Sequence, residues 1–195
     1  YQRQAELAHG GPLPENHPAN YAMFVLVGFD DPGLIVLPTH RLVGDIANWS
    51  ANAFVSLASE HLEVTPTPYQ AGHLAEVARM LSGFGAGVMA MFDRATGRVW
   101  KLRMRDPSIM KQLEPGQSDA WRSLDVAILR RWVIDELIVR TMNAGRDVRL
   151  AYTPDASAVA QKLVDESLEV AFLVQSTPVS ALADLGDQGE VMPQK

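Results

Sequence analysis

Three polar residues follow an apolar run near the start of the chain. Thr39, His40 and Arg41 come directly after Gly33–Pro38. Because Pro38 favours the end of a strand, we expect these side chains at the strand's rim, where they could meet a phosphate or carboxylate group. A guanidinium binds either anion with two parallel hydrogen bonds. The alternative is structural: Arg41 pairs with a surface acid or caps a carbonyl group, and His40 packs at the strand end.

Two further residues could take part in chemistry. Asp125 lies in an apolar stretch of a predicted helix, and a buried acid needs a partner. It is a catalytic candidate together with His40, and the alternative is an ion pair with Arg122 or Arg41. Lys195 could supply an ammonium group to a phosphate, or it could be an ordinary solvated lysine.

Other motifs in the chain have simpler explanations. Gly83–Gly87 follows a predicted helix and precedes a predicted strand, the reverse of the order in a dinucleotide-binding loop, so we predict a helix end. His61–Glu63 resembles the His-x-Glu of zinc deaminases, but the chain has no cysteine to complete that site. We predict no metal ligands, because the spacing of a helical metal pair is missing from His9, His17, His61 and His73.

Composition narrows the class of protein. Of the 195 residues 47% are hydrophobic and 21% are charged, which is ordinary for a globular domain. No apolar run approaches the roughly 20 residues that a transmembrane helix needs. The absence of cysteine fits a reducing compartment, so we expect a cytoplasmic protein. A net charge of -6 disfavours nucleic acid as a partner.

Two hairpins are predicted from apolar runs joined by turn residues. The first joins Tyr21–Phe29 to Leu34–Leu42 across Asp30–Gly33, and the second joins Gly87–Phe92 to Arg98–Met104. The adjacent acids Asp30 and Asp31 are interpreted as turn residues.

The spacing of apolar residues also predicts helices. The predicted helices cover Tyr1–His9, Asp45–Glu60 with Asp45 as N-cap, Leu74–Leu81, Asp119–Arg140 and Ala156–Glu166. Strands at Val148–Tyr152 and Val170–Val174 flank the last helix, and such a crossover permits parallel pairing. We therefore predict one α+β domain over residues 1–195, with a mixed sheet, antiparallel hairpins and packed helices.

Three segments in succession resemble a known family. They are Gly33–Arg41, Leu124–Val126 with Leu129, and Gly189–Lys195, and they are similar to the family called domain of unknown function 1015. The resemblance spans nearly the whole chain but only the C-terminal half of a typical member. In such members an Asp-Gly-His-His-Arg motif lies upstream and a Ser-Thr-Tyr-Phe stretch lies downstream. With Tyr1 as the first residue, we expect a fragment of a larger protein, truncated at both ends.

The resemblance implies a ParB- and sulfiredoxin-like fold with kinship to free-serine kinases. It implies a nucleotide-dependent phosphotransferase that uses ATP or ADP with magnesium and acts on a small hydroxylated metabolite such as serine. Arg41 and Lys195 would neutralise phosphate charge, His40 would orient the substrate or nucleotide, and Thr39 would donate a hydrogen bond. The alternatives are a non-catalytic binding or scaffolding protein and a ParB-like regulatory protein, the latter disfavoured by the acidic charge.

Overall fold

The computed structural model describes residues 1–193 and divides into two compact units, Tyr1–Ile35 and Val36–Lys195. The first unit contains helix α1 (Gln2–His9), which confirms the predicted helix, and the 3-10 turn η1 (Pro18–Asn20). Gly10 ends α1 with a φ of 78°. Glycine adopts this left-handed conformation without a steric penalty, so a helix end is expected there.

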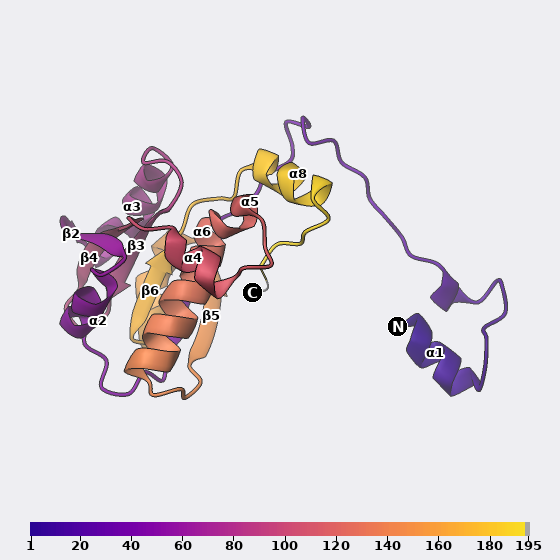
Figure 1. Ribbon diagram of the computed structural model, residues 1–195, viewed down its shortest axis with the longest axis horizontal. Helices are drawn as coiled ribbons and strands as arrows, with labels where there is room; N and C mark the ends of the chain where they lie inside the picture. Colours follow the sequence, from indigo (N-terminus) through magenta and orange to yellow (C-terminus); the bar gives the residue numbers. More distant parts are fainter. Residues whose placement is uncertain (194–195) are drawn as a thin grey trace. The chain divides into compact units, whose positions relative to one another are not determined.

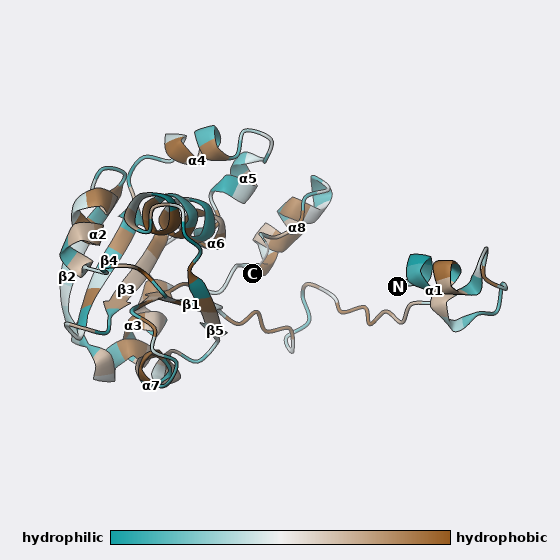
Figure 2. Cartoon of the chain, turned by 90° about the horizontal axis from the view of Figure 1, so that it is seen from below, coloured by the Kyte–Doolittle hydropathy of each residue, from teal (hydrophilic) through white to brown (hydrophobic). Residues whose placement is uncertain are grey.

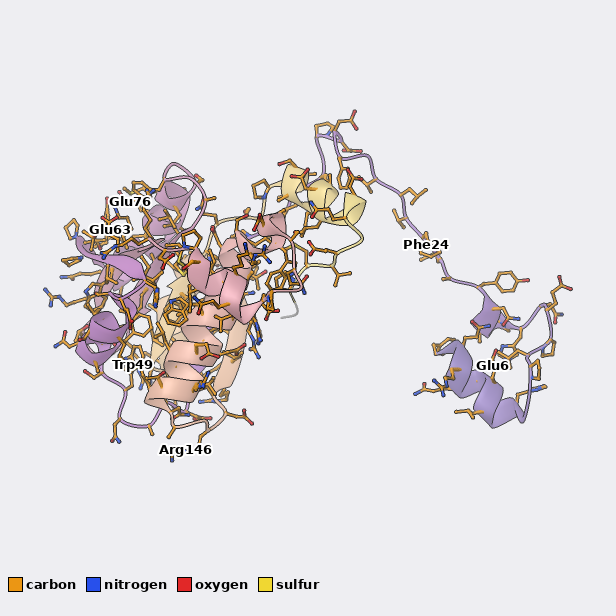
Figure 3. The ribbon with its side chains drawn as sticks, in the orientation of Figure 1. Glu6, Phe24, Trp49, Glu63, Glu76 and Arg146 are labelled. Carbon is orange, nitrogen blue, oxygen red and sulfur yellow. The ribbon has the colours of Figure 1, made fainter. Side chains whose placement is uncertain are left out.

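The predicted hairpin of Tyr21–Phe29 and Leu34–Leu42 is wrong. The turn residues do form turns, because the Asp31 amide donates to the Gly28 carbonyl oxygen at 3.1 Å and the Leu34 amide donates to the Asp31 carbonyl oxygen at 3.0 Å. The first run, however, has no regular structure. Figure 3 labels Phe24 on this stretch, and this residue is 80% exposed. An isolated two-stranded hairpin is marginally stable in water, so turn residues alone do not establish strand pairing.

The second unit is built around one six-stranded sheet (Figure 1). The strand order is β2-β4-β3-β6-β1-β5. Its strands are β1 (His40–Gly44), β2 (Leu62–Gln70), β3 (Val88–Asp93), β4 (Arg98–Met104), β5 (Arg149–Thr153) and β6 (Val170–Leu173). The strands β3 and β4 pair directly, which confirms the second predicted hairpin.

Every strand pair in the described sheet is antiparallel, so the prediction of a mixed sheet is wrong. The predicted strand-helix-strand unit is present, with β5 and β6 joined through α7 (Val159–Asp165). These two strands do run in the same direction, but β1 lies between them and pairs antiparallel with both. The crossover therefore leaves room for an inserted strand from elsewhere in the chain.

Eight α-helices occur across residues 1–193, together with shorter turns and one π-helix. Besides α1 and α7 these elements are α2 (Ala51–Ala58), η2 (Ala71–His73), α3 (Leu74–Leu81), α4 (Ser108–Leu113), α5 (Asp119–Arg122), α6 (Asp125–Ala127), η3 (Ile128–Met142), η4 (Ala156–Ala158) and α8 (Val179–Asp187). Ser50, not Asp45, caps α2, because its side chain accepts a hydrogen bond from the Ala53 amide. None of the helices in this described part is long and apolar enough to cross a membrane.

The predicted helix over Asp119–Arg140 is broken. It stops after α5, and Leu124 has extended backbone with a ψ of 130° before α6 begins. The continuation η3 is a π-helix, in which the Asn143 amide donates to the carbonyl oxygen of Ile138, five residues earlier. Apolar spacing located the helical segment correctly but gave no sign of the break.

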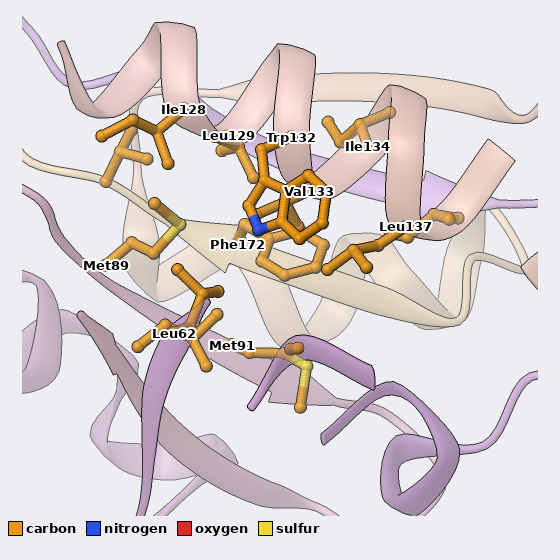
Figure 4. Packing of buried hydrophobic residues seen from close by; sticks show 14 of the residues in the cluster. Leu62, Met89, Met91, Ile128, Leu129, Trp132, Val133, Ile134, Leu137 and Phe172 are labelled. Carbon is orange, nitrogen blue, oxygen red and sulfur yellow. The ribbon is translucent and has the colours of Figure 1, made fainter. Parts of the chain in front are cut away.

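Helices cover both faces of the sheet (Figure 2). On one face, α2 and η3 enclose a core that includes Met91 and Phe172, and Figure 4 shows Trp132 and Leu137 of η3 reaching toward it. On the other face, α3 and α7 enclose a second core that includes Leu42. Successive residues of a strand point to opposite faces, so each strand contributes to both cores.

Candidate functional site

One end of the sheet gathers the residues of interest. Because the strands are antiparallel, β1 and β3 begin at the end where β4, β5 and β6 finish. His40 stands opposite Thr153, and Ala90 stands opposite Leu173. The loops that follow β6 and α3 therefore meet at the start of β1.

His40 lies on this end of the sheet against a cavity of about 440 Å³. Its side chain is 1% exposed, and its Nδ1 accepts a hydrogen bond from the Val174 amide at 3.2 Å. Burial lowers the pKa of His40 to about 4, Asp155 opposes this shift, and Arg41 adds to it. The imidazole is therefore neutral at pH 7, with its hydrogen on Nε2. That nitrogen has no hydrogen-bond partner among residues 1–193.

Asp125 lies against a second cavity, of about 300 Å³. Its Oδ1 accepts from the Gly87 amide at 2.6 Å, and its Oδ2 accepts from Gln175 Nε2 at 3.2 Å. Burial raises the pKa of Asp125, and these two hydrogen bonds oppose the rise. Gln175 Nε2 also lies within hydrogen-bond distance of the carbonyl oxygens of Gly85 (2.7 Å) and Val88 (3.2 Å), so its two hydrogens are shared among three acceptors.

The two cavities adjoin, since Ser82, Gln175 and Ser176 line both. The structure thus places the two catalytic candidates, His40 and Asp125, on adjoining cavities although they lie far apart in the sequence. A neutral imidazole can donate a hydrogen bond, and a carboxylate with a raised pKa can accept a proton. Perturbed groups of this kind gather at functional sites more often than elsewhere.

Arg41 is not part of this arrangement. As the neighbour of His40 in β1, it points to the opposite face of the sheet, where it is 3% exposed. Its Nη1 donates to the carbonyl oxygen of Thr39 at 3.1 Å. Lys195 lies outside the described residues. The predicted phosphate-binding role of Thr39, His40, Arg41 and Lys195 remains a prediction.

Sequence reasoning missed Gln175, Ser176 and Ser82, because isolated polar residues in loops carry no pattern. It did mark the loop that supplies Gly87. Gly85 and Gly87 have φ values of 80° and 74°, which glycine tolerates best, and the Gly87 amide then reaches Asp125. Within residues 1–193 no group of three acidic or histidine side chains is placed to hold a metal ion.

Comparison with known proteins places the chain in a family. It belongs to the family described as "Protein of unknown function (DUF1015)", whose sequence model matches residues 1–127. The matched residues include Gly33–Arg41 and Asp125, whereas Gly189–Lys195 lies beyond them. No curated protein matches the sequence.

Two solved structures are similar in fold. One is free serine kinase in complex with AMP, with a TM-score of 0.49, 14% identity, and coverage of 88% of this chain and 56% of that chain. The other is a mutant of free serine kinase in complex with AMP, with a TM-score of 0.47, 13% identity, and coverage of 86% and 54%. The chain spans little more than half the length of these proteins. At such values the likeness says nothing about the activity of this chain.

Proposed function

We propose that the protein is a nucleotide-dependent phosphotransferase that acts on a small hydroxylated metabolite such as serine. The observation that carries the proposal is the pair of adjoining cavities, of which His40 lines one, Asp125 lines the other and Gln175 lines both. Their size suits a small metabolite beside part of a nucleotide. The resemblance of the chain's family to free-serine kinases, which depends on a motif upstream of this chain in typical members, is the ground for choosing phosphotransfer as the reaction.

In this proposal Asp125 is the general base. Its carboxylate accepts the proton of the substrate hydroxyl, whose oxygen then forms a bond to the terminal phosphorus of ATP or ADP. The bond between that phosphorus and the bridging oxygen breaks, and its electron pair leaves with the nucleotide product. Burial raises the pKa of Asp125, which makes this carboxylate a better proton acceptor than an ordinary aspartate.

The remaining residues bind and orient. Gln175 donates to the carboxylate of Asp125 and holds it in place. His40 Nε2 has no partner among residues 1–193 but is closed to solvent, so within this proposal the ring must shift toward the cavity before it donates to a substrate or phosphate oxygen. Thr39 lines neither cavity and Lys195 lies outside the described residues, so their phosphate-binding role is carried by the sequence alone. Within this proposal magnesium arrives with the nucleotide, whose charge it neutralises. Arg41 faces the other side of the sheet, so it contacts no phosphate in these cavities.

The test is phosphoserine formation by the full-length protein, with ATP or ADP, magnesium and serine, measured by mass spectrometry. Asp125→Asn should lower kcat by about 100-fold or more, as the loss of a general base does. The matched control is Asp165→Asn, which changes an exposed carboxylate on α7 and should leave kcat unchanged. No phosphoserine above the blank, or equal activity in Asp125→Asn, would count against the proposal.

A further inference from the structure

Arg41 is a buried charge without an acidic partner. Its side chain is 3% exposed, and its one hydrogen bond within residues 1–193 goes to the Thr39 carbonyl oxygen. None of the ion pairs in this part of the chain includes it. A buried guanidinium is costly unless an anion neutralises it.

The surroundings of Arg41 add donors rather than acids. Tyr152 stands opposite Arg41 in the pairing of β1 with β5. Burial lowers the pKa of Arg41, Tyr152 opposes this, and the nearby Arg130 of η3 lowers it further. The acid of η3 that pairs with Arg130 is also engaged elsewhere, because Asp135 contacts Arg130 at 3.3 Å and Arg131 at 2.7 Å.

An anion could still reach the guanidinium. Nε and Nη2 of Arg41 are not among the unpartnered nitrogens of the described residues that are closed to solvent. The hydrogen bond to Thr39 uses Nη1 alone. The guanidinium therefore keeps donors that can hold an oxyanion, and its planar fork suits a phosphate group.

We infer that Arg41, together with Arg130 and the Tyr152 hydroxyl, forms a binding site for the phosphate group of a small ligand. Arg41 and Arg130 carry two positive charges, and the carboxylate of Asp135 is shared between Arg130 and Arg131. The site therefore keeps a net positive charge, which matches a doubly charged phosphate better than a singly charged carboxylate. The site lies on the face of the sheet covered by η3, whereas the cavity of His40 lies on the other face. It goes beyond the proposed phosphotransfer and does not require it.

The test is the change in Tm of the protein on adding inorganic phosphate, compared with sodium chloride at equal ionic strength. At roughly ten times Kd, phosphate should raise the Tm by about 3 to 6 °C. Arg41→Met should abolish this rise, and its Tm without phosphate should equal or exceed that of the wild type, because the unneutralised charge is gone. Arg130→Met and Tyr152→Phe should reduce the rise.

Two controls separate this site from others. Arg149 is an exposed arginine of β5, the strand that carries Tyr152, and it pairs with Asp45 at 3.5 Å. The variant Arg149→Met should keep the full rise in Tm. His40→Asn should also keep it, which distinguishes this site from the proposed catalytic cavities. Citrate and AMP in place of phosphate show whether a carboxylate suffices or a nucleotide binds more tightly.

The inference is overturned by the absence of any phosphate-dependent rise in the wild type, or by an equal rise in Arg41→Met. If Arg41→Met does not fold, Arg130→Met and Tyr152→Phe decide the matter. An undiminished rise in both would overturn the inference, and a diminished rise would support it. Because no acceptor or nucleotide is needed, a failure of the kinase assay leaves this result unaffected.

Discussion

Replacing His40 by asparagine should remove part of the acid sensitivity of the fold. The pKa of His40 is 6.5 in an unfolded chain and about 4 in the folded protein, chiefly because the ring is buried. Between these two values the unfolded chain binds more protons than the folded one, so the free energy of unfolding rises with pH. The stabilisation is complete above about pH 6.5 and is lost as the pH falls toward 4.

The size of this effect follows from the two pKa values. The difference between 6.5 and about 4 corresponds to about 3 kcal/mol, since each pKa unit is worth about 1.4 kcal/mol. That is a large share of the roughly 5 to 15 kcal/mol that stabilises an ordinary domain. Asparagine is a suitable replacement because its Oδ1 can accept the Val174 amide hydrogen in place of Nδ1, and it does not titrate.

The assay is urea unfolding of both proteins at several values between about pH 4 and pH 7.5, followed by far-UV circular dichroism. The aspartates and glutamates titrate in both proteins, so the difference between the two curves isolates His40. The wild type should lose about 3 kcal/mol more than His40→Asn over this window. Parallel curves would refute the reasoning, because they would mean that His40 is not buried in its neutral form.

Two further predictions concern a close packing contact and a pair of hydrogen bonds. Gly44→Ala should destabilise the fold by about 1 to 3 kcal/mol, since its Cβ would lie 2.5 Å from Leu168 Cδ2 and 3.3 Å from Leu168 Cα; an unchanged urea midpoint would contradict this close approach. Glu190→Ala should cost about 1 to 3 kcal/mol, because the Glu190 carboxylate accepts from both the amide (2.6 Å) and the hydroxyl of Ser118 at the start of α5. Glu190→Gln should retain part of that stability, because its amide oxygen can still accept one of these hydrogen bonds, and an unchanged urea midpoint in Glu190→Ala would contradict the prediction.

Local sequence patterns predicted the elements whose partners lie nearby. The hairpin of β3 and β4 formed because both strands also pair with other strands, β6 and β2 respectively. The hairpin predicted for Tyr21–Phe29 also has turn residues but no such neighbours, so its apolar run stays unpaired. Turn residues and alternation describe what a segment can do, whereas pairing depends on distant strands that a single sequence does not reveal.

The candidate site was predictable only in part. His40 and Asp125 were found because each places a polar group in an apolar context. That His40 and Arg41 face opposite sides of the sheet also follows from strand geometry, since adjacent residues in a strand alternate. The sequence interpretation assigned both to one anion pocket and overlooked this alternation. Gln175, which lines both cavities, has no sequence signal.

The break before α6 explains how Asp125 comes to lie in a cavity. An unbroken helix from Asp119 would use its backbone amides internally, whereas the extended backbone at Leu124 lets α6 start afresh with Asp125 as its first residue. The carboxylate then accepts the amide hydrogen of Gly87 rather than capping its own helix. One hydrogen bond thus joins the loop after α3 to the start of α6, and the same burial that allows this bond raises the pKa of Asp125. The helix break, the glycine turn and the perturbed carboxyl are therefore parts of a single arrangement.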